Sequence, residues 1–311
     1  MRNAASTGAT AVGGAALVGT IVGFFGARSW VFDLLANFRV QYAIVLAASA
    51  GILALLRRRR LAAVAAVGAV INAGLVLPLY AASPVDPTGE DRLVVVSFNV
   101  QLEDPVPRLG WMLDGEPDVV ILFESSRVAE ERLRNASTGY VVTSGINEGR
   151  NFGPTVLSRT PLTVTELPIT SSAGGALRIE VPLGDEVVAV YGVHPASPSN
   201  AARTGDRDRL LEAIGLAAAG EEGPVVVVGD FNATPWSHAF GLVSDPAELV
   251  NSQRGFGYSP TWPAGIWPIL GIPLDHLIHS ASLTTVSREV GPDLGPDHRP
   301  IRVTLAAAGS G

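Results

Sequence analysis

Three long apolar runs occupy the first quarter of the chain. They extend over Ser6–Ala27, Tyr42–Leu56 and Leu61–Ala82, and the four arginines Arg57–Arg60 separate the second run from the third. A helix needs about 20 apolar residues to cross the hydrocarbon core of a bilayer, and the arginine stems can lengthen the short second run by snorkelling. Glycine is also denser in these runs than helices in water tolerate. The pattern predicts three transmembrane helices.

The four arginines also predict an orientation. Arginine-rich loops favour the cytoplasmic side of a membrane, so the membrane domain, residues 1–82, would begin in the cytoplasm. Trp30–Phe38 would be a short external loop, and the chain after about residue 83 would lie outside the cytoplasmic membrane. Two alternatives stay open. Arg2 and the small residues that follow it also suit a signal peptide, and the runs could instead pack as a soluble helical hairpin.

The pattern changes after the membrane domain. Residues 83–91 read SPVDPTGED, whose prolines, glycine and acids are typical of a linker. Residues 92–305 alternate short β-branched runs with turns, and residues 306–311 are expected to be a flexible tail. Expected helices are Pro107–Leu113, Glu130–Asn135 and Asn200–Ala219, and expected strands are Leu93–Phe98, Asp118–Phe123, Thr155–Ser158, Ala176–Val181, Val187–Val193, Val225–Gly229, Leu274–His279 and Ile301–Leu305.

Composition and charge narrow the function. The 311 residues include no cysteine, which excludes disulfides, thiolate metal sites and a cysteine nucleophile. Residues 1–91 carry 7 Arg against 4 acidic residues, net +3, whereas residues 92–311 carry 15 Arg against 25 acidic residues, net −10. Nucleic-acid affinity comes mainly from basic side chains that neutralise phosphates. An acidic domain without lysine therefore disfavours a DNA substrate.

Polar residues follow six of the predicted strands or lie in the loops beside them. Taken singly, each has an ordinary role in a turn or a helix cap. Together they supply the oxygen and nitrogen groups that bind a hard divalent cation and hydrolyse a phosphate ester. In VVVVGDFNATP, for example, four valines run into an acid and an amide one residue apart. The set comprises Asn99, Glu124, His194, Asp230 with Asn232, Asp275 with His276, and Asp297 with His298.

At these positions the chain resembles the endonuclease/exonuclease/phosphatase superfamily, and its layout resembles the membrane-anchored bacterial members. The resemblance covers essentially the whole of residues 92–305, and GDFN followed by two later DH pairs is its specific part. It implies a four-layer α/β sandwich, in which two mixed sheets pack face to face between helices. The matching stretches, in the family's order, are SFNVQ (97–101), PDVVILFES (117–125), GPTVLSRTP (153–161), YGVHPASP (191–198), VVVGDFNATP (226–235), IPLDHLIHS (272–280) and GPDHRPI (295–301).

The resemblance also implies a metal site. It makes Glu124 the main carboxylate ligand of Mg²⁺, with Mn²⁺ as the alternative ion, and it makes Asn99 and Asp297 supporting ligands. Many members carry a carboxylate two residues after the first Asn, where this chain has Gln101. A neutral amide binds Mg²⁺ more weakly than a carboxylate, so an arrangement with two metal ions is disfavoured, and the number of ions stays open.

The remaining site residues are assigned to catalysis by the same resemblance. Asp230 would orient or deprotonate the attacking water, Asn232 would hydrogen-bond the phosphoryl group, and His194 would contact the scissile phosphate. His298 would be the second acid–base group, steered by Asp275, because a carboxylate partner fixes the tautomer of an imidazole and raises its basicity. The implied activity is metal-dependent hydrolysis of a phosphate ester.

The expected substrate is a small or lipid-linked phosphate ester, with membrane lipids as partners. Residues 92–305 leave little room for the DNA-gripping insertions of the family's nucleases. The stretch TWPAGIWPIL places Trp262, Trp267 and Leu270 shortly before the first DH pair, so this loop could cover a lipid or enter the bilayer interface. Packing against the sheet edge explains the loop equally well, and the sequence leaves the oligomeric state open.

Two other functions remain as alternatives. A membrane binding protein that kept the fold and lost catalysis predicts damage at the motif residues, yet Glu124, Asp230, Asn232, Asp297 and His298 are all present. An anchored extracellular nuclease predicts a basic groove, which the acidic balance of the outer domain disfavours.

Overall fold

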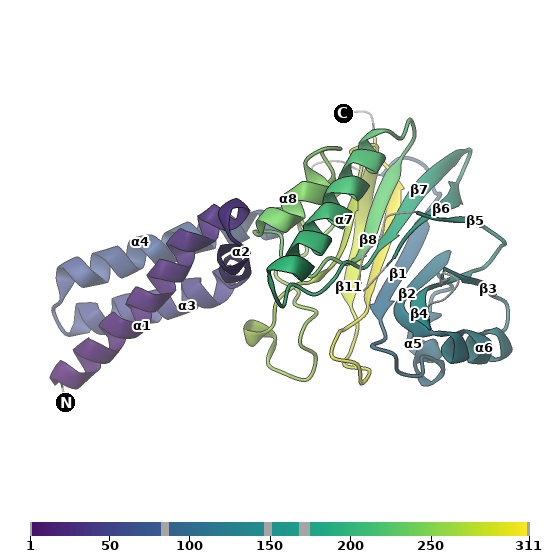
Figure 1. Ribbon diagram of the computed structural model, residues 1–311. Helices are drawn as coiled ribbons and strands as arrows, with labels where there is room; N and C mark the ends of the chain where they lie inside the picture. The colour runs from purple at the N-terminus through teal and green to yellow at the C-terminus, as the bar shows by residue number, and fades with distance from the viewer. Residues whose placement is uncertain (1, 82–86, 146–150, 168–174, 310–311) are drawn as a thin grey trace.

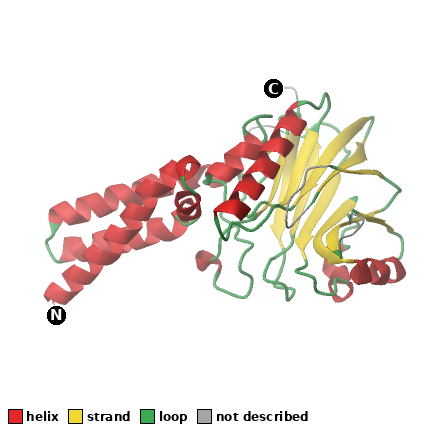
Figure 2. Ribbon diagram, in the orientation of Figure 1, coloured by secondary structure: helices red, strands yellow, loops and turns green. Residues whose placement is uncertain are grey.

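A bundle of helices leads into a domain of two β-sheets (Figures 1 and 2). The computed structural model describes residues 2–81, 87–145, 151–167 and 175–309. The predicted linker therefore lies partly outside the described residues, although Thr88 already donates from its backbone nitrogen to Ala307 of the sheet domain, over 2.9 Å. The bundle consists of α1 (Arg2–Val22), η1 (Gly23–Arg28), α2 (Trp30–Ala36), α3 (Arg39–Leu55), α4 (Arg59–Val76) and η2 (Leu77–Tyr80).

Two helices of the bundle are long and apolar enough to cross a membrane. They are Asn3–Arg28, of 26 residues, and Arg59–Tyr80, of 22 residues. The third candidate is the pair α2 and α3, which bends by 66° between Ala36 and Arg39 and counts as a span only when both helices are taken together. Alone, the 17 residues of α3 extend about 25 Å. The structure thus has two to three candidate spans where the sequence predicted three.

The predicted external loop Trp30–Phe38 is wrong in one respect, because most of it is the helix α2. Its only acid, Asp33, is 2% exposed and accepts hydrogen bonds from Arg207, over 2.6 Å, and from the backbone nitrogen of His238, over 2.7 Å. Both partners belong to the sheet domain. These tertiary contacts hold α2 against the sheet domain, and no local sequence pattern predicts them.

The first sheet has the strand order β11-β12-β1-β2-β4-β3, and the second has the order β5-β6-β7-β8-β10-β9. Each sheet contains one parallel pair, β1 with β2 and β7 with β8, among antiparallel pairs. The strands of the first sheet are β1 (Leu93–Asn99), β2 (Val119–Ser126), β3 (Val141–Ser144), β4 (Phe152–Ser158), β11 (Leu283–Val290) and β12 (Ile301–Ala307). Those of the second are β5 (Thr163–Glu166), β6 (Ala176–Leu183), β7 (Glu186–Val193), β8 (Val225–Asp230), β9 (Val250–Asn251) and β10 (Asp275–His279).

Helices cover the outer face of each sheet, which gives the predicted four layers (Figure 2). The second sheet packs against α7 (Ala201–Ala219) and α8 (His238–Ser244), and the first packs against α5 (Leu109–Met112) and α6 (Arg127–Ala136). Short 3-10 turns complete the domain at η3 (Val106–Arg108) and η4 (Pro268–Leu270). The four-layer α/β sandwich predicted from the sequence is confirmed.

The four valines of β8 are explained by the position of this strand between two layers. Val226 and Val228 face the core between the two sheets, whereas Val225 and Val227 face α7 and α8. All four are buried. A strand covered on both faces needs apolar residues at every position rather than at alternate positions, and this explains why four valines run into the polar residues of the GDFN motif.

The segment predicted as a flexible tail, residues 306–311, begins as part of the sheet domain, and Ala308 also donates from its backbone nitrogen to Ser282 over 2.8 Å. β12 continues to Ala307, which pairs with Leu283, and Ala306 is fully buried. Three small alanines carry little strand signal in the sequence, but pairing with β11 satisfies their backbone groups and extends the strand.

Candidate active site

The predicted site residues meet at one edge of the two sheets. The parallel strands β1 and β2 end at this edge, and so do β7 and β8. β10 runs antiparallel to β8 and begins there, with Asp275 directly opposite Asp230. β12 also begins there, after the loop that contains Asp297 and His298. The topology therefore gathers residues that are almost 200 positions apart in the chain.

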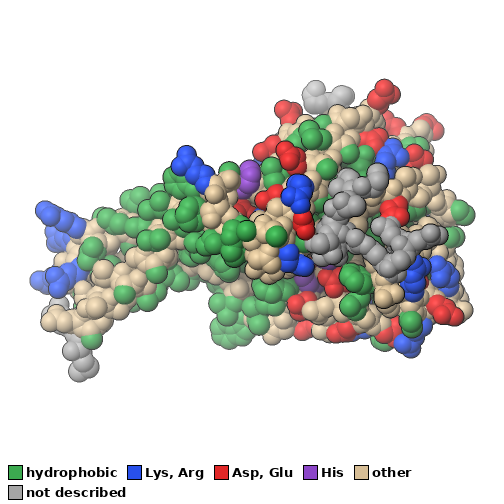
Figure 3. Space-filling model, in the orientation of Figure 1, with side chains coloured by type: hydrophobic (Ala, Val, Ile, Leu, Met, Phe, Trp, Pro, Cys, Tyr) green, Lys and Arg blue, Asp and Glu red, His purple; other side chains and the backbone are tan. Residues whose placement is uncertain are grey.

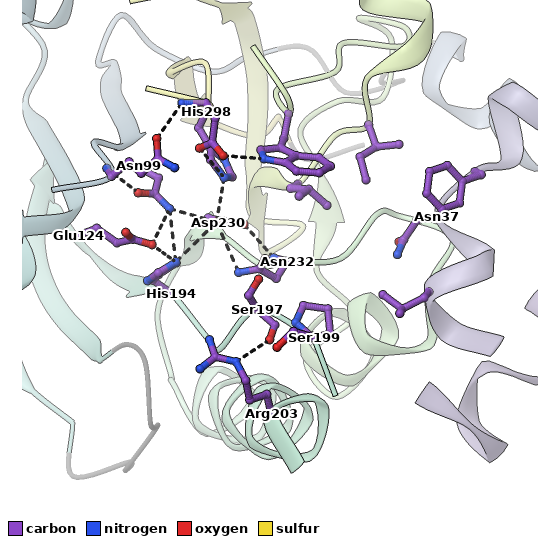
Figure 4. A pocket seen from close by; sticks show the side chains of 18 residues that line it. Asn37, Asn99, Glu124, His194, Ser197, Ser199, Arg203, Asp230, Asn232 and His298 are labelled. Atoms are coloured by element: carbon purple, nitrogen blue, oxygen red, sulfur yellow. Dashed lines mark hydrogen bonds and ion pairs between the residues drawn. The ribbon is translucent and has the colours of Figure 1, made fainter. Parts of the chain in front are cut away.

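A cavity of about 460 Å³ opens at this edge (Figure 4). Asp275 is fully buried behind His298 and does not line it. The other seven of the eight predicted site residues line the cavity: Asn99, Glu124, His194, Asp230, Asn232, Asp297 and His298.

Glu124 is aimed at the cavity by an irregularity of β2. The pairing of β2 with β4 shifts between Leu122 and Ser125, and Glu124 lies between them with a φ of 51°. A bulge of this kind redirects a side chain, and left-handed backbone at a residue other than glycine costs about 1–3 kcal/mol. The redirected carboxylate has Oε1 3.3 Å from the Asn99 amide nitrogen and 3.4 Å from His194 Nε2.

The end of β8 depends on Gly229. Its φ is 147°, and a Cβ at this position would lie 2.0 Å from the carbonyl oxygen of Val193. Only glycine allows β7 and β8 to approach this closely, and the approach brings Asp230 Oδ2 to 3.6 Å from His194 Nε2. The glycine of the GDFN motif therefore has a steric role, and the acid after it has the polar one.

Asp230 and Asn232 come together through a turn. β8 ends at Asp230 and Asn232 has a φ of 51°, so the two residues do not lie on one face of an extended strand. The backbone nitrogen of Asn232 donates to Asp230 Oδ1 over 2.9 Å, and its amide nitrogen lies 3.5 Å from Oδ2. The turn fixes both side chains relative to each other.

Asp275 and His298 form a buried hydrogen-bonded pair. His298 Nδ1 lies 2.8 Å from Asp275 Oδ2, while its Nε2 points toward Asp230 Oδ2 at 3.5 Å. Two backbone nitrogens bond the hydroxyl of Thr261 at this point, those of Leu274 and Asp275, both at 3.1 Å. The imidazole is thus fixed on one side by a carboxylate and faces the site with the other.

The electrostatics of the pair favour a bound proton. Burial alone would lower the pKa of His298, but the carboxylates of Asp275 and Asp230 outweigh it and raise that pKa to about 10. Burial also raises the pKa of Asp275, although the charge of His298 opposes the rise. With its pKa at about 10, the imidazole of His298 carries a proton on both nitrogens at neutral pH, so Nδ1 donates to Asp275 and Nε2 can donate into the site.

Asp230 is held in its ionised form. Burial by itself would raise its pKa, but His298 and His194, together with the backbone N–H of Asn232, bring the pKa below its ordinary value. The amide nitrogen of Asn99 adds a hydrogen bond to Asp230 Oδ2 over 3.2 Å. An ionised carboxylate surrounded by fixed donors is suited to orient a water molecule at the mouth of the cavity.

Asn99 and Asp297 take their positions from neighbouring residues. The amide oxygen of Asn99 accepts from the backbone nitrogen of Gln101 over 3.0 Å, so its amide nitrogen faces the carboxylates. Asp297 accepts from the indole nitrogen of Trp262 over 3.1 Å, and its backbone nitrogen donates to the Gln101 side chain over 3.2 Å. Gln101, the departure from the family pattern, therefore helps to position both residues and lines the cavity itself.

Two groups of side chains here are suited to a metal ion. Asp230, Asp275 and His298 form a buried cluster whose ligand atoms lie within 4.8 Å of one another, so it can hold an ion. The cavity is also lined by the carboxylates of Glu124 and Asp297, which offer the hard oxygen donors that Mg²⁺ prefers. The identity of the ion is not fixed by either group.

The sequence reasoning missed several cavity residues. Ser197, Ser199 and Arg203 follow β7 or begin α7, and Arg203 donates from Nε to the carbonyl of Ser197 over 3.0 Å. More unexpected are three residues from the helical bundle, Leu34, Asn37 and Phe38, which also line the cavity. No sequence signal links them to the site.

Arg207, in the second turn of α7, is fully buried. It donates to Asp33 of α2 over 2.6 Å, to Asp208 over 2.9 Å and to the backbone carbonyl of Asn232 over 3.1 Å. Through this one side chain, the helical bundle is connected to the turn that carries Asn232.

Solved structures resemble the sheet domain. A crystal structure of humanized D. rerio TDP2 is 18% identical, covers 70% of this chain and 99% of its own, and has a TM-score of 0.57. An endonuclease/exonuclease/phosphatase from Beutenbergia cavernae is 21% identical over 71% and 72% of the chains, with a TM-score of 0.52. The mannosyl-6-phosphatase Bt3783 of Bacteroides thetaiotaomicron is 15% identical over 69% and 99%, also with a TM-score of 0.52. These likenesses establish the fold.

The sequence itself matches a family model. No curated protein matches the chain, but the model of the Endonuclease/Exonuclease/phosphatase family matches residues 96–310, which is more than half of the chain and includes all eight site residues predicted from the sequence. The chain belongs to the endonuclease/exonuclease/phosphatase family.

Proposed function

We propose that this protein is a membrane-anchored, metal-dependent hydrolase of phosphate esters that acts outside the cytoplasmic membrane. The observation that carries the proposal is the convergence of Glu124, Asp230, Asp297 and His298 on one cavity. Their oxygen and imidazole groups are those required to neutralise a phosphate, to position a water molecule and to protonate a leaving oxygen.

The proposed ion is Mg²⁺, with Mn²⁺ as the alternative, held by Glu124 and Asp297 with support from Asn99. The fit rests on the donor set, since both carboxylates line the cavity and are partly exposed, with 27% and 42% of their side-chain surface accessible. When bound, such an ion neutralises phosphate oxygens and stabilises the leaving oxygen. The buried cluster of Asp230, Asp275 and His298 suits an ion less well, because the proton of its histidine already compensates the two carboxylates.

The protein's own groups divide the remaining work. Asp230, ionised and fixed by four donors, orients the attacking water and accepts its proton. Asn232 offers its amide N–H to a phosphoryl oxygen, and His194 Nε2 faces the same space from the end of β7. His298 supplies a proton from Nε2, and Asp275 fixes its orientation and keeps it charged.

The arrangement of the bundle supports the proposed location of the sheet domain outside the cytoplasmic membrane. In Figure 1 the beginning of α1 and the turn between α3 and α4 lie at the end far from the sheets. This turn carries the exposed Arg57–Arg60, and Figure 3 shows basic side chains gathered at that end. Because positive loops favour the cytoplasm, we place this end in the cytoplasm and the sheet domain outside.

Small or lipid-linked phosphate esters are the favoured substrates. A structural relative, D. rerio TDP2, has been solved with a single-strand DNA product, which keeps a nuclease as the alternative function. The net charge of −10 after residue 91 argues against it. A binding protein without catalysis is the other alternative, and the presence of all the motif residues argues against that.

A substrate screen tests the proposal. The detergent-purified protein is assayed with Mg²⁺ or Mn²⁺ on a nitrophenyl phosphodiester, nitrophenyl phosphate, phospholipids and plasmid DNA, with Asp230→Ala as the control. We expect turnover of at least one ester that disappears with the chelator EDTA and falls by a factor of at least about 100 in the variant. Equal rates for the two proteins would contradict the proposal, and turnover of DNA alone would favour the nuclease.

A further inference from the structure

We infer that the bend between α2 and α3 forms a wall of the substrate cavity, and that the substrate is a phosphate ester with a long alkyl or acyl chain drawn from the bilayer. The inference rests on the proposed hydrolase function and specifies its substrate class. It depends on how the cavity is walled, on where the bend lies and on what surrounds the opening.

The cavity has a polar side and an apolar side. The polar side contains the carboxylates, amides and imidazoles described above. The opposite side is formed by Leu34 and Phe38 of the bundle and by Ile272 and Leu274 of the sheet domain. A phosphate and a small polar alcohol would leave the partly exposed Leu34 and the exposed Phe38 in contact with water, whereas an alkyl chain would cover them, at roughly 25 cal/mol per Å² of apolar surface buried.

The bend is fixed in place beside the catalytic turn. Asn37, at the bend, accepts two hydrogen bonds from Thr234, from its backbone nitrogen over 3.0 Å and from its hydroxyl over 2.9 Å. Thr234 follows Asn232 by two residues. Figure 4 shows Asn37 on the ribbon of the bundle, across the cavity from Asn99 and Glu124. The bundle is therefore part of the cavity wall as well as an anchor.

An exposed apolar loop lies next to the same bend. Trp267 is 78% exposed and Leu270 is 60% exposed, and Ile266 and Ile269 are also exposed. Gln41, in the first turn of α3, donates to the carbonyls of Ile269 and Gly271, both over 3.0 Å. This loop thus contacts a helix that belongs to a candidate membrane span, which places its apolar side chains at the level where a bilayer would begin.

These features favour one occupant. The apolar side of the cavity is continuous with helices that are themselves suited to a membrane, so the compound that reaches it with least exposure to water is a lipid already in that bilayer. The phosphate of such a lipid lies at the bilayer surface and its chain lies below. In the cavity, the phosphate would meet the polar side while the chain contacts Leu34 and Phe38.

Matched substrates that differ only in chain length test the inference. The protein is reconstituted in phosphatidylcholine proteoliposomes and assayed with Mg²⁺ on methyl and dodecyl 4-nitrophenyl phosphate, and on methyl and dodecyl phosphate as monoesters. The variants are Phe38→Ser and the pair Trp267→Ser with Leu270→Ser. Phe25→Ser is the matched control, because Phe25 is similarly exposed in the same bundle, 43% against 38% for Phe38, but does not line the cavity.

The quantity measured is the loss of kcat/KM on the dodecyl ester divided by the loss on the methyl ester, so that partition into the bilayer cancels. We expect a quotient of about 10 for Phe38→Ser, the scale of losing apolar contact in a pocket, a quotient above 3 for the double loop variant, and about 1 for Phe25→Ser. Quotients near 1 for all variants, with methyl-ester turnover that still requires Asp230, would overturn the inference and leave the hydrolase intact. Absence of turnover of all four esters would contradict the hydrolase function itself.

Discussion

At the scale of residues, the site depends on the backbone at Glu124 and on the charges around His298. The left-handed backbone at Glu124 depends on a shift in strand pairing, and the raised pKa of His298 depends on the carboxylates of Asp275 and Asp230. Neither feature can be inferred from the neighbouring residues in the sequence, because both depend on strands that meet only in the folded chain. Motifs preserve residue types and order, which is why Asn99, Glu124, Asp230 and His298 could be recognised in the sequence.

The Asp275–His298 pair gives a prediction with a defined pH dependence. Asp275→Asn removes the carboxylate that contributes most to raising the pKa of His298. Because His298 acts in its protonated form, activity is lost as the pH rises through its pKa, and the variant should lose activity at a lower pH than the wild type. We also expect kcat at pH 7 to fall about 100-fold. The measurement is the pH–rate profile from pH 6 to pH 10.5.

A purely structural role of Asp275 would give a different profile. It would lower kcat at every pH and leave the alkaline midpoint unchanged. The control is Asp293→Asn, which alters an acid of the preceding loop that is outside the cavity lining and should leave both kcat and the midpoint as in the wild type.

At the scale of elements, the buried strands and the long helix were predicted and the marginal elements were not. β1, β2, β7 and β8 are rich in β-branched residues and buried, so their sequence signal is strong. The elements that were not predicted are short, or are partly exposed with mixed composition, and tertiary pairing defines them. They are β3, β5, β9, β11, α8 and, in the bundle, α2.

The helix α2 allows a prediction about coupling between the bundle and the catalytic turn. Asp33→Asn removes the negative charge that is paired with the fully buried Arg207. Arg207 keeps Asp208 and the carbonyl of Asn232 as partners. Breaking a buried ion pair costs about 3 kcal/mol, so the melting temperature should fall by about 5–10 °C. We expect kcat to fall as well, because Arg207 without its ion pair holds the carbonyl of Asn232 less firmly.

The matched control for this variant lies on α7, the helix that carries Arg207. Asp206→Asn also removes an acid paired with an arginine, Arg209, whose side chain is 72% exposed. Surface pairs contribute about 0–1 kcal/mol, so this variant should melt within about 2 °C of the wild type. Equal effects of the two substitutions would contradict a specific role for Asp33.

At the scale of the whole molecule, the sequence predicted two regions but not their contact. Apolar runs and arginines define the bundle, and motifs define the sheet domain, each by local pattern. Three hydrogen bonds join the two regions across 161 to 197 positions of the chain. Thr234 donates to Asn37, Arg207 donates to Asp33, and the indole nitrogen of Trp236 donates to the carbonyl of Leu75. Such pairs cannot be predicted from a single sequence, although they hold the bundle residues that line the cavity.

The proposed orientation can be tested because the chain has no cysteine. A single cysteine is introduced at Asp185, which is exposed in the turn between β6 and β7, or at Arg58 in the turn between α3 and α4. A membrane-impermeant maleimide applied to intact cells should label Asp185→Cys and should label Arg58→Cys only after the cells are opened. The reverse pattern would contradict an outward-facing catalytic domain.

The most direct test of the central claim is a magnesium titration of ester hydrolysis by wild-type protein and Glu124→Gln, after removal of metal with EDTA. The account predicts no turnover without metal, saturable recovery in the wild type, and a requirement for about 10–100-fold more Mg²⁺ in the variant, the usual effect of weakening a metal site. Hydrolysis that persists in EDTA, or identical titration curves for the two proteins, would contradict the claim that Glu124 holds the ion beside Asp230.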